Sequence, residues 1–362
     1  MSDKIKVGIT HGDFNGIGYE VILKMLDDNR LFELCTPIVY GSAKIAANYR
    51  KQLSLQGQAP VQIKDAENAA EGQAYIINVI GEDAKVEPGH PSAEAGKGAF
   101  EALERAVADL RAGKIDVLLT APVNKSTIHS ELFTFPGHTE YLEASIGDGN
   151  KALMILFNDT VRVALATIHL PISKVAEAIT KESLMEKIRL LNNSLIQDFG
   201  IVKPRIAVLG LNPHAGDDGL LGSEEKEIIL PAVEESRAKK IHVFGPYAAD
   251  GFFGSGNFRK FDGILAMYHD QGLAPFKTLA GGSGVNFTAG LPFVRTSPDH
   301  GTGFDIAGKG EASPDSIREA LYAAIDIYRN RLNHAERTAN PLRRQYVDKS
   351  KDNVVLDLSK EK

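Results

Sequence analysis

Short apolar runs alternate with longer amphipathic segments along most of the chain. The apolar runs cover residues 4–10, 36–40, 74–80, 115–120, 152–157, 161–167, 205–210, 241–244 and 264–267. The amphipathic segments cover residues 42–55, 93–112, 181–199 and 313–333. Apolar runs of this length predict buried strands, and the amphipathic segments predict helices. Their alternation predicts an α/β fold with mainly parallel sheets covered by helices on both faces.

Polar and helix-breaking residues predict where these elements begin and end. Three serines precede helical patterns and are expected to cap them, namely Ser42, Ser223 and Ser313. Gly272 and Pro275 follow the apolar run 264–267 and are expected to break the chain there. The segments 281–286 and 295–301 are rich in glycine, serine, proline and charged residues, so we expect loops.

Composition narrows the class of protein. The 362-residue chain has a net charge of −6, so it lacks the basic field that non-specific nucleic-acid binding requires. No apolar run in it approaches the roughly 20 residues of a membrane-spanning helix. Its one cysteine, Cys35, rules out an internal disulfide and a zinc site made of cysteines. We therefore expect a cytoplasmic protein whose partners are neither nucleic acids nor membranes.

Three histidines follow apolar runs closely, and they are His169, His214 and His269. In open parallel sheets, ligands bind beyond the carboxyl ends of the strands, where such side chains converge. Three imidazoles leave coordination positions open, as in a catalytic metal site. The spacing does not distinguish zinc from other divalent ions. A single histidine of this kind is more often structural, so the hypothesis depends on the set of three.

Two aspartates lie close to the ends of the same apolar runs. Asp250 follows the run 241–244, and Asp270 follows His269 directly. Carboxylates beside metal ligands can orient them or act as a base, so both are candidate catalytic residues. The alternative interpretation is that His269 and Asp270 only cap a turn.

A second set of polar residues suits an anionic, phosphorylated ligand. It comprises Lys125, His138, Thr139, Lys277, Asn286 and Arg295. An imidazole, a hydroxyl and the N–H groups at a helix start near Thr139 would together bind phosphate. The alternatives are that Thr139 merely caps that helix and that each lysine is a solvated surface charge.

The first apolar run leads into a loop with the sequence HGDFNGIGYE, residues 11–20. Its glycines allow a tight turn into a helix N-terminus, which would suit an anion or a cofactor. The loop lacks the G-x-G-x-x-G fingerprint of dinucleotide-binding folds. An ordinary strand-to-helix connection is therefore an equally good interpretation.

Six motifs resemble, in order, those of the 4-hydroxythreonine-4-phosphate dehydrogenase family. They are TAPVNK (120–125), GHTEYL (137–142), IHLPI (168–172), LNPHAG (211–216), YHDQG (268–272) and RTSPDHGT (295–302). The resemblance extends from Val7 to about Tyr328. It implies two α/β/α domains with a central cleft, similar to the isocitrate and isopropylmalate dehydrogenases. It also implies NAD or NADP as cofactor and a homodimer that completes the site at the subunit interface.

The expected domain organisation follows from this resemblance. Residues 1–125 with about 285–334 are expected to form a first, discontinuous α/β/α domain. Residues 126–284 are expected to form a second one that carries the metal ligands. Residues 335–362 are charged and polar and are expected to form a C-terminal tail.

The resemblance also assigns site residues one by one. It places the family's metal ligands at His169, His214 and His269. The implied metal is zinc, magnesium or cobalt, and it would lie between subunits. The resemblance places the substrate contacts at His138, Thr139, Lys277, Asn286 and Arg295. Two segments depart from the family. Phe14, Asn15 and Tyr19 stand where the family has proline, alanine and proline, and the segment 248–251 keeps Asp250 but lacks a threonine.

The implied reaction is the NAD-dependent, metal-dependent oxidation of 4-phosphooxy-L-threonine at C3. Decarboxylation to 3-amino-2-oxopropyl phosphate would follow, as a step of pyridoxal phosphate biosynthesis. A metal on the hydroxyl oxygen would ease its loss of a proton, with Asp250 as the preferred base. One alternative is a dehydrogenase of threonate or erythronate 4-phosphate. Another is a protein that binds a metal and a nucleotide without turnover.

Overall fold

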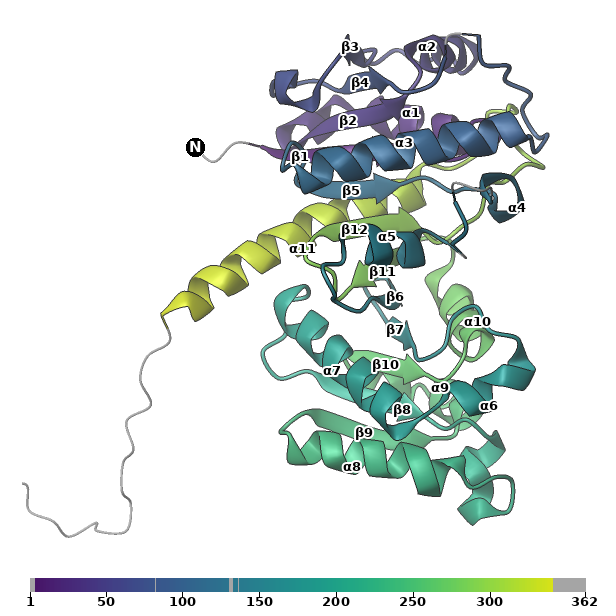
Figure 1. Cartoon of the computed structure of the whole chain (residues 1–362), viewed down its shortest axis with the longest axis vertical. Helices are drawn as coiled ribbons and strands as arrows, with labels where there is room; N and C mark the ends of the chain where they lie inside the picture. Colours follow the sequence, from purple (N-terminus) through teal and green to yellow (C-terminus); the bar gives the residue numbers. More distant parts are fainter. Residues whose placement is uncertain (1–3, 82, 130–132, 136, 341–362) are drawn as a thin grey trace, which may run out of the picture.

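The computed structural model describes residues 4–81, 83–129, 133–135 and 137–340. These residues form one sheet of twelve strands with helices on both faces (Figure 1). The strand order across the sheet is β3-β4-β2-β1-β5-β12-β11-β6-β7-β10-β8-β9. The prediction of an α/β fold built mainly on parallel strands is confirmed.

Strands and helices alternate along the chain, as the apolar pattern predicts. The strands are β1 (Ile5–Thr10), β2 (Cys35–Gly41), β3 (Val61–Ile63), β4 (Tyr75–Asn78), β5 (Val117–Thr120), β6 (Leu153–Phe157), β7 (Arg162–Leu165), β8 (Arg205–Leu209), β9 (His242–Tyr247), β10 (Gly263–Ala266), β11 (Val285–Ala289) and β12 (Val294–Pro298). The α-helices are α1 (Gly18–Leu26), α2 (Ala43–Gln52), α3 (Ala93–Arg111), α4 (Lys125–Ile128), α5 (His138–Ile146), α6 (Val175–Ala178), α7 (Lys181–Gln197), α8 (Leu230–Ala238), α9 (Ala249–Gly254), α10 (His269–Ala280) and α11 (Asp315–Ala339).

Strand direction changes at three neighbouring pairs near the middle of the sheet. β11 runs antiparallel to both of its neighbours, β12 and β6, and β6 runs antiparallel to β7. The other neighbouring strands are parallel, including β12 with β5. The strands of both expected domains therefore lie in one sheet. The division into residues 1–125 with 285–334 and residues 126–284 stays a prediction.

β11 and β12 correct the sequence interpretation. The segments 281–286 and 295–301 were expected to be loops, but strands occupy 285–289 and 294–298 in the centre of the sheet. Polar residues such as Arg295 interrupt the apolar pattern there, so neither segment reads as a buried strand. These two strands bring candidate site residues into the sheet itself.

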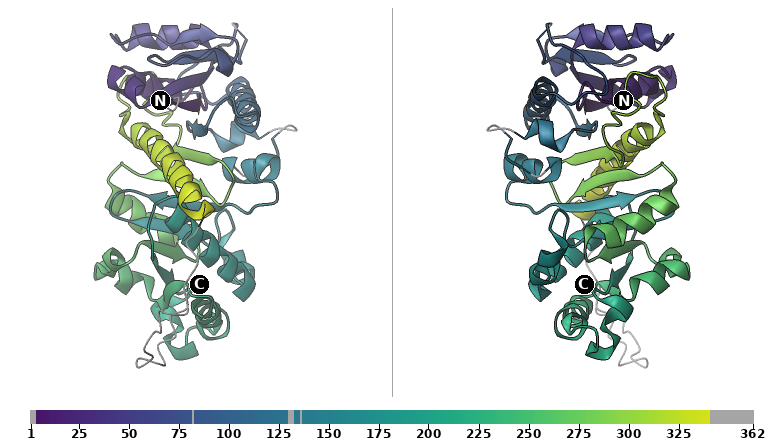
Figure 2. Two further views of the ribbon diagram at one scale, coloured as in Figure 1. Left: turned by 90° about the vertical axis from the view of Figure 1, so that its left-hand side faces the viewer. Right: turned by 90° about the vertical axis from the view of Figure 1, so that its right-hand side faces the viewer.

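Both faces of the sheet are buried under helices. α1, α7 and α11 cover one face, and α3, α5 and α10 cover the other, as the position of α11 opposite α3 and α5 shows (Figure 2). Residues of β5 alternate accordingly. Val117 and Leu119 belong to the apolar core under the first group of helices, and Leu118 belongs to the core under the second. This two-sided burial explains why the strands appear as continuous apolar runs.

Helix α10 begins at His269, directly after β10, and contains both Gly272 and Pro275. The expectation that these residues break the chain is therefore wrong. A Cβ atom on Gly272 would lie 2.8 Å from Leu165 and 2.9 Å from Val163. The glycine instead lets α10 pack closely against β7, which places His269 and the helix start beside the end of that strand.

One of the three expected serine caps is present, because Ser42 is the N-cap of α2 and its hydroxyl oxygen accepts the N–H of Ile45. The N-cap of α11 is Pro314, and Ser313 before it accepts the N–H of Asp315. Ser223 is not a side-chain cap, because the segment after it is a π-helical turn, Glu225–Ile229, that precedes α8. The carbonyl of Ser223 accepts the N–H groups of this turn instead.

The C-terminal helix α11 is longer than expected and continues to Ala339. It therefore includes the first residues of the expected polar tail, whose residues 341–362 lie outside the described residues. Within the described ranges, no helix combines the length and the apolar character needed to cross a membrane.

A buried ion pair fixes α11 against the end of α7. Arg331 Nε donates to Asp198 Oδ1 at 2.6 Å, and the Asp198 side chain is fully buried. Ser194 Oγ donates to the second carboxylate oxygen at 2.7 Å. Asn330 Nδ2 donates to the backbone carbonyl of Asp198 at 2.8 Å.

We expect Asp198→Ala to lower the free energy of unfolding by about 3 kcal/mol, because it leaves the half-buried Arg331 without its counter-charge. Urea unfolding followed by circular dichroism measures this change. The matched control is Glu177→Ala, which removes a pair with Lys174 whose side chains are 76% and 64% exposed. That variant should lose less than about 1 kcal/mol. Equal losses in the two variants would contradict the structural role of Asp198.

Candidate functional site

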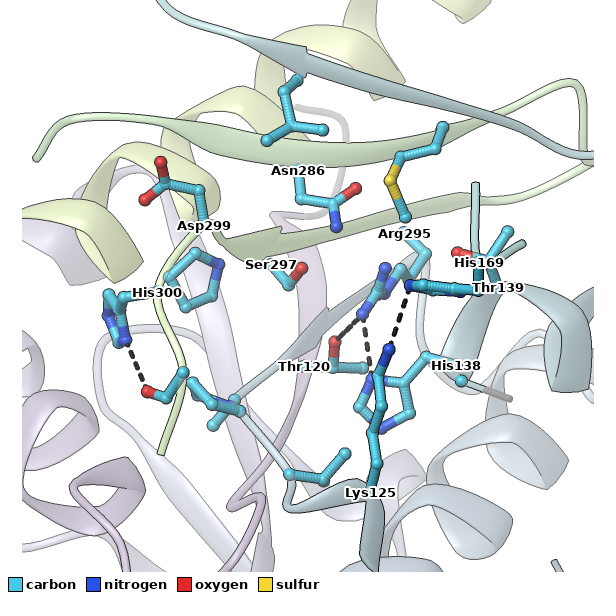
Figure 3. Close-up of a pocket in the computed structure, with 18 of the residues that line it drawn as sticks. Thr120, Lys125, His138, Thr139, His169, Asn286, Arg295, Ser297, Asp299 and His300 are labelled. Atoms are coloured by element: carbon cyan, nitrogen blue, oxygen red, sulfur yellow. Dashed lines mark hydrogen bonds between the residues drawn. The ribbon is translucent and has the colours of Figure 1, made fainter. Parts of the chain in front are cut away.

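A cavity of about 400 Å³ lies between α5 and α10, over strands β5, β6, β11 and β12 (Figure 3). Seven of the ten site residues expected from the sequence line it: His138, Thr139, His169, His269, Lys277, Asn286 and Arg295. The other three do not line it: His214, Asp250 and Asp270. The structure thus brings together all of the expected substrate contacts and two of the three expected metal ligands.

Arg295 lies on β12 and is only 3% exposed, so its charge is inside the protein rather than on a loop. Its Nε and Nη2 donate to the Thr120 hydroxyl at 3.0 and 2.6 Å. Its Nη1 donates to Thr288 Oγ1 at 3.2 Å. Burial lowers the pKa of Arg295 to about 10, which leaves it positively charged at neutral pH.

The guanidinium of Arg295 has no contacting carboxylate among the residues that the structure describes. Its hydrogen-bond partners are two hydroxyls and one imidazole, and Glu140 acts on it only at longer range. Burying a charge without a counter-ion is costly. The position therefore favours an anionic ligand in the cavity.

His138 begins α5 and is held by Arg295, whose Nη2 donates to His138 Nδ1 at 3.0 Å (Figure 3). Burial, together with the charges of Arg295 and Lys125, lowers the pKa of His138 to about 3. The ring is therefore neutral, and because Nδ1 accepts, the proton sits on Nε2. Nε2 is buried without a partner in the described part of the chain, so His138 offers a free donor to a ligand.

Thr139 and Asn286 complete this group. Thr139 does not cap α5, whose N-cap is Gly137, so the capping alternative is wrong. Its hydroxyl instead lies 3.5 Å from that of Thr288. The Asn286 Oδ1 is buried and has no partner among the described residues. Unpaired polar atoms in a buried wall are costly unless a ligand or water satisfies them.

His169 lies between a carboxylate and an amine. Its Nδ1 is 3.3 Å from Glu140 Oε1, and its Nε2 is 2.9 Å from Lys125 Nζ. The hydrogen bond from His169 holds the pKa of Glu140 below its ordinary value. Glu140 is therefore an anion that fixes the tautomer and orientation of the His169 ring.

His269 has the same arrangement. Its Nδ1 lies 2.6 Å from Asp270 Oδ1, and its ring centroid is 6.1 Å from that of His169. Histidines that ligate metals commonly donate their outer nitrogen to a carboxylate, as both do here. These two residues therefore fit a divalent cation, and Asp270 has the position of a residue that orients a ligand.

His214 is not brought to this pair within one chain. It lies in the turn Pro213–Gly219 after β8, where residues 214 to 218 all have positive φ. Glu225 holds the start of this turn, since its Oε1 accepts the N–H groups of Leu211 and Asn212 at 2.7 and 2.8 Å. Among the described residues no three His, Cys, Asp or Glu side chains are grouped as a metal site. The set of three ligands stays a prediction.

Asp250 is also apart from the cavity. It lies in the first turn of α9, after the edge strand β9. Nothing within the described chain brings it near His169 or His269, so its role as a base stays a prediction.

A second cavity of about 530 Å³ adjoins the first and shares Asp299, His300 and Gly301 with it. The glycine-rich segment 281–283 and the start of α11 line its other side. A helix N-terminus beside glycines suits a phosphate-bearing cofactor. His300 Nε2 is buried and has no partner in the described ranges, so a cofactor there would find a free polar atom.

The N-terminal loop packs into the core along its length, and only its Ile17 lines the second cavity among the described residues. Residues 11–20 are all buried, and the ring of His11 stacks on that of Tyr19 with centroids 5.2 Å apart. Tyr19 stacks in turn on Tyr49 at 5.7 Å. Phe14 packs against the backbone position of Gly98 in α3. Phe14 and Tyr19 are therefore core residues, and a cofactor contact of this loop stays a prediction.

Residues 33–324 match the family described as pyridoxal phosphate biosynthetic protein PdxA. A protein of Bacteroides thetaiotaomicron named 4-hydroxythreonine-4-phosphate dehydrogenase is 57% identical over 356 residues, which are 98% of each chain. The chain belongs to the PdxA family. The resemblance stated from the six sequence motifs is thereby confirmed.

Other members of the PdxA family differ in name. A protein of Oceanobacillus iheyensis, named putative D-threonate 4-phosphate dehydrogenase, is 39% identical and covers 90% of this chain and 99% of its own. The structure of a putative 4-hydroxythreonine-4-phosphate dehydrogenase from Salmonella typhimurium is 34% identical with a TM-score of 0.76. The match covers 90% of this chain and 100% of the Salmonella typhimurium chain.

Several residues of the site were missed from the sequence. Glu140, Asp299 and His300 line the cavity, although each lies within one of the six motifs. Burial raises the pKa of Asp299, and Lys277 Nζ donates to its backbone carbonyl at 3.2 Å. The motifs were the available signal, but only the fold shows that these positions face the same cavity.

The buried His11 predicts a loss of stability in acid. Burial lowers its pKa from 6.5 to about 4, so between these values the unfolded chain binds a proton that the folded chain does not. The contribution of His11 to the free energy of unfolding is therefore complete above about pH 6.5. It declines by about 3 kcal/mol as the pH falls to 4. Urea unfolding of His11→Met should show a shallower decline than wild type. The exposed His242→Gln is the control, and a decline in His11→Met as steep as in wild type would contradict this account.

Proposed function

We propose that the chain is a 4-hydroxythreonine-4-phosphate dehydrogenase. It would oxidise 4-phosphooxy-L-threonine at C3 with NAD or NADP and release carbon dioxide to give 3-amino-2-oxopropyl phosphate. This step would serve pyridoxal phosphate biosynthesis in the cytoplasm. The names of its relatives support the reaction, and one observation on the structure supports the substrate class. That observation is the buried Arg295, which has no contacting carboxylate.

The anionic end of the substrate is assigned to the group around Arg295. The neutral His138 offers its Nε2–H, and the exposed Lys277 adds a second positive charge at the same cavity. Hydrogen bonds to phosphate or carboxylate oxygens from such donors are stronger than neutral ones. An uncharged substrate would leave the charge of Arg295 uncompensated.

A divalent cation is assigned to His169 and His269. When bound, it would act as a Lewis acid on the hydroxyl that is oxidised. Glu140 and Asp270 hold the two rings by their Nδ1 atoms, so Nε2 would be the coordinating atom of each ring. A nicotinamide cofactor is assigned to the adjoining cavity, where Asp299 and His300 separate it from the substrate.

The missing third imidazole supports a homodimer with the site at its interface. Leu170 and Ile172, which follow His169, are 45% and 71% exposed, and Leu220, which follows the His214 turn, is 80% exposed. Exposed apolar residues beside both parts of an incomplete ligand set favour a second copy as their partner. That copy would bring its own His214 to the histidine pair.

A four-carbon sugar-acid phosphate is the second candidate substrate. The Oceanobacillus iheyensis relative carries such a name, and the anion group around Arg295 would bind either phosphate. The two substrates differ only in the group at C2, an amine or a hydroxyl.

The assignment is tested by following NADH formation with 4-phosphooxy-L-threonine, D-threonate 4-phosphate and D-erythronate 4-phosphate, with and without a chelator. We expect the highest kcat/KM with the first substrate and loss of turnover with the chelator. Faster turnover on a sugar acid would overturn the assigned substrate, and full activity after verified metal removal would overturn the role of the metal. If none of the three compounds gives NADH, the assignment as a dehydrogenase is wrong.

We expect Arg295→Met to lower kcat/KM about 100-fold, because the anion loses the buried positive charge and the one guanidinium N–H that no described residue accepts. The ligand-free variant should melt no lower than wild type, since a buried methionine avoids the cost of an uncompensated charge. Inorganic phosphate should raise the melting temperature of wild type but not of the variant. Phosphate stabilisation that survives in Arg295→Met would contradict the anion site.

A further inference from the structure

Lys125 makes a contact that the proposed reaction does not use. It lies at the start of α4, after the TAPV segment that ends β5, and its Nζ is 2.9 Å from His169 Nε2. Figure 3 shows its amine between the rings of His138 and His169, beside the cavity. The inference drawn from this contact rests on the proposed function, since it concerns how that site is loaded.

The direction of this hydrogen bond is fixed by the groups on either side. The Nδ1 of His169 faces the carboxylate of Glu140, so Nδ1 carries the ring proton and Nε2 presents a lone pair. An ammonium group has three donors and no acceptor. Lys125 therefore donates to the Nε2 lone pair of His169.

This is the same lone pair that coordination requires. The Nδ1 atom is already used by Glu140, so Nε2 is the atom of His169 left for a metal. One lone pair cannot serve an ammonium proton and a cation together. Lys125 and a divalent ion therefore exclude one another at His169, and loading the site requires Lys125 to leave.

The cavity offers Lys125 another partner. Lys125 lines the same cavity as Arg295 and Asn286, where the anionic substrate is placed. Its positive charge is among the causes that depress the pKa of the neighbouring His138, so its field reaches the anion group. A lysine has a flexible stem that can turn between nearby partners.

We propose that Lys125 has two positions that couple the loading of the site. In the ligand-free protein its ammonium occupies His169 Nε2. When that nitrogen is used for a divalent cation, Lys125 turns into the cavity and binds the anionic group of the substrate. By linkage, the substrate then tightens binding of the cation by the same factor by which the cation tightens binding of the substrate.

The test compares Lys125→Met with Lys277→Met in the full-length protein. Both variants remove one positive charge from the same cavity, but only Lys125 contacts a proposed ligand nitrogen. Metal-free protein is titrated with Co²⁺ in the absence of substrate and cofactor. Binding is followed by the visible absorption bands of the protein-bound Co²⁺. We expect Lys125→Met to bind Co²⁺ about tenfold more tightly than Lys277→Met, because a charge-assisted hydrogen bond no longer competes.

The second arm adds 4-phosphooxy-L-threonine without NAD, so that no turnover occurs. We expect the substrate to tighten Co²⁺ binding in wild type and to do so less in Lys125→Met. Equal Co²⁺ affinities in the two lysine variants would overturn the competition at His169. An undiminished effect of substrate in Lys125→Met would overturn the second position of the lysine.

The outcomes also separate this inference from the proposed function. If wild-type protein takes up no Co²⁺, with or without substrate, the metal assignment itself fails. If wild type binds Co²⁺ and oxidises the substrate while both variants bind it equally, the proposed function stands and only the role of Lys125 is lost. Melting curves of both variants verify that each is folded before titration.

Discussion

The buried charge of Arg295 is the constraint on which the rest of the site depends. A guanidinium inside a sheet must have its N–H groups satisfied, and Thr120, Thr288 and His138 do this from three different elements. Because His138 accepts a hydrogen bond at Nδ1, its ring is neutral. Its Nε2–H is then available to a ligand in the cavity. The donors of the site are therefore set in place before a ligand arrives, and the positive potential around them selects for an anion.

Much of the fold and part of the site follow from the sequence for identifiable reasons. The apolar runs and amphipathic segments gave nearly all of the outer strands and the long helices. His169 and His269 meet because they follow β7 and β10, which are neighbouring parallel strands, so their ends converge. β11 and β12 were missed because polar site residues interrupt their apolar pattern. The contact between Lys125 and His169 joins residues on elements that only the fold brings together, and no spacing in the chain encodes it.

His214 follows a strand end but does not reach the cavity within one chain, so its position in the sequence alone does not place it in the site. It follows β8, which also neighbours β10, so its position in the sequence is equivalent to that of the other two histidines. The turn after β8 is left-handed over five residues, the buried Glu225 holds its start, and His214 within it does not line the cavity. A run of left-handed residues is strained and needs such support. Local backbone conformation, which residue types alone do not reveal, therefore decides whether a candidate ligand reaches the site.

The place of β11 and β12 in the sheet has a consequence for how the protein is made. These strands are the last to be synthesised, yet they lie between β5 and β6. Until they emerge from the ribosome, both of those earlier strands have an unpaired edge, and unpaired edges invite pairing with other chains. Closing the sheet also requires contacts between residues far apart in the sequence, which form slowly. The chain therefore stays dependent on protection from aggregation until nearly all of its described length has been translated.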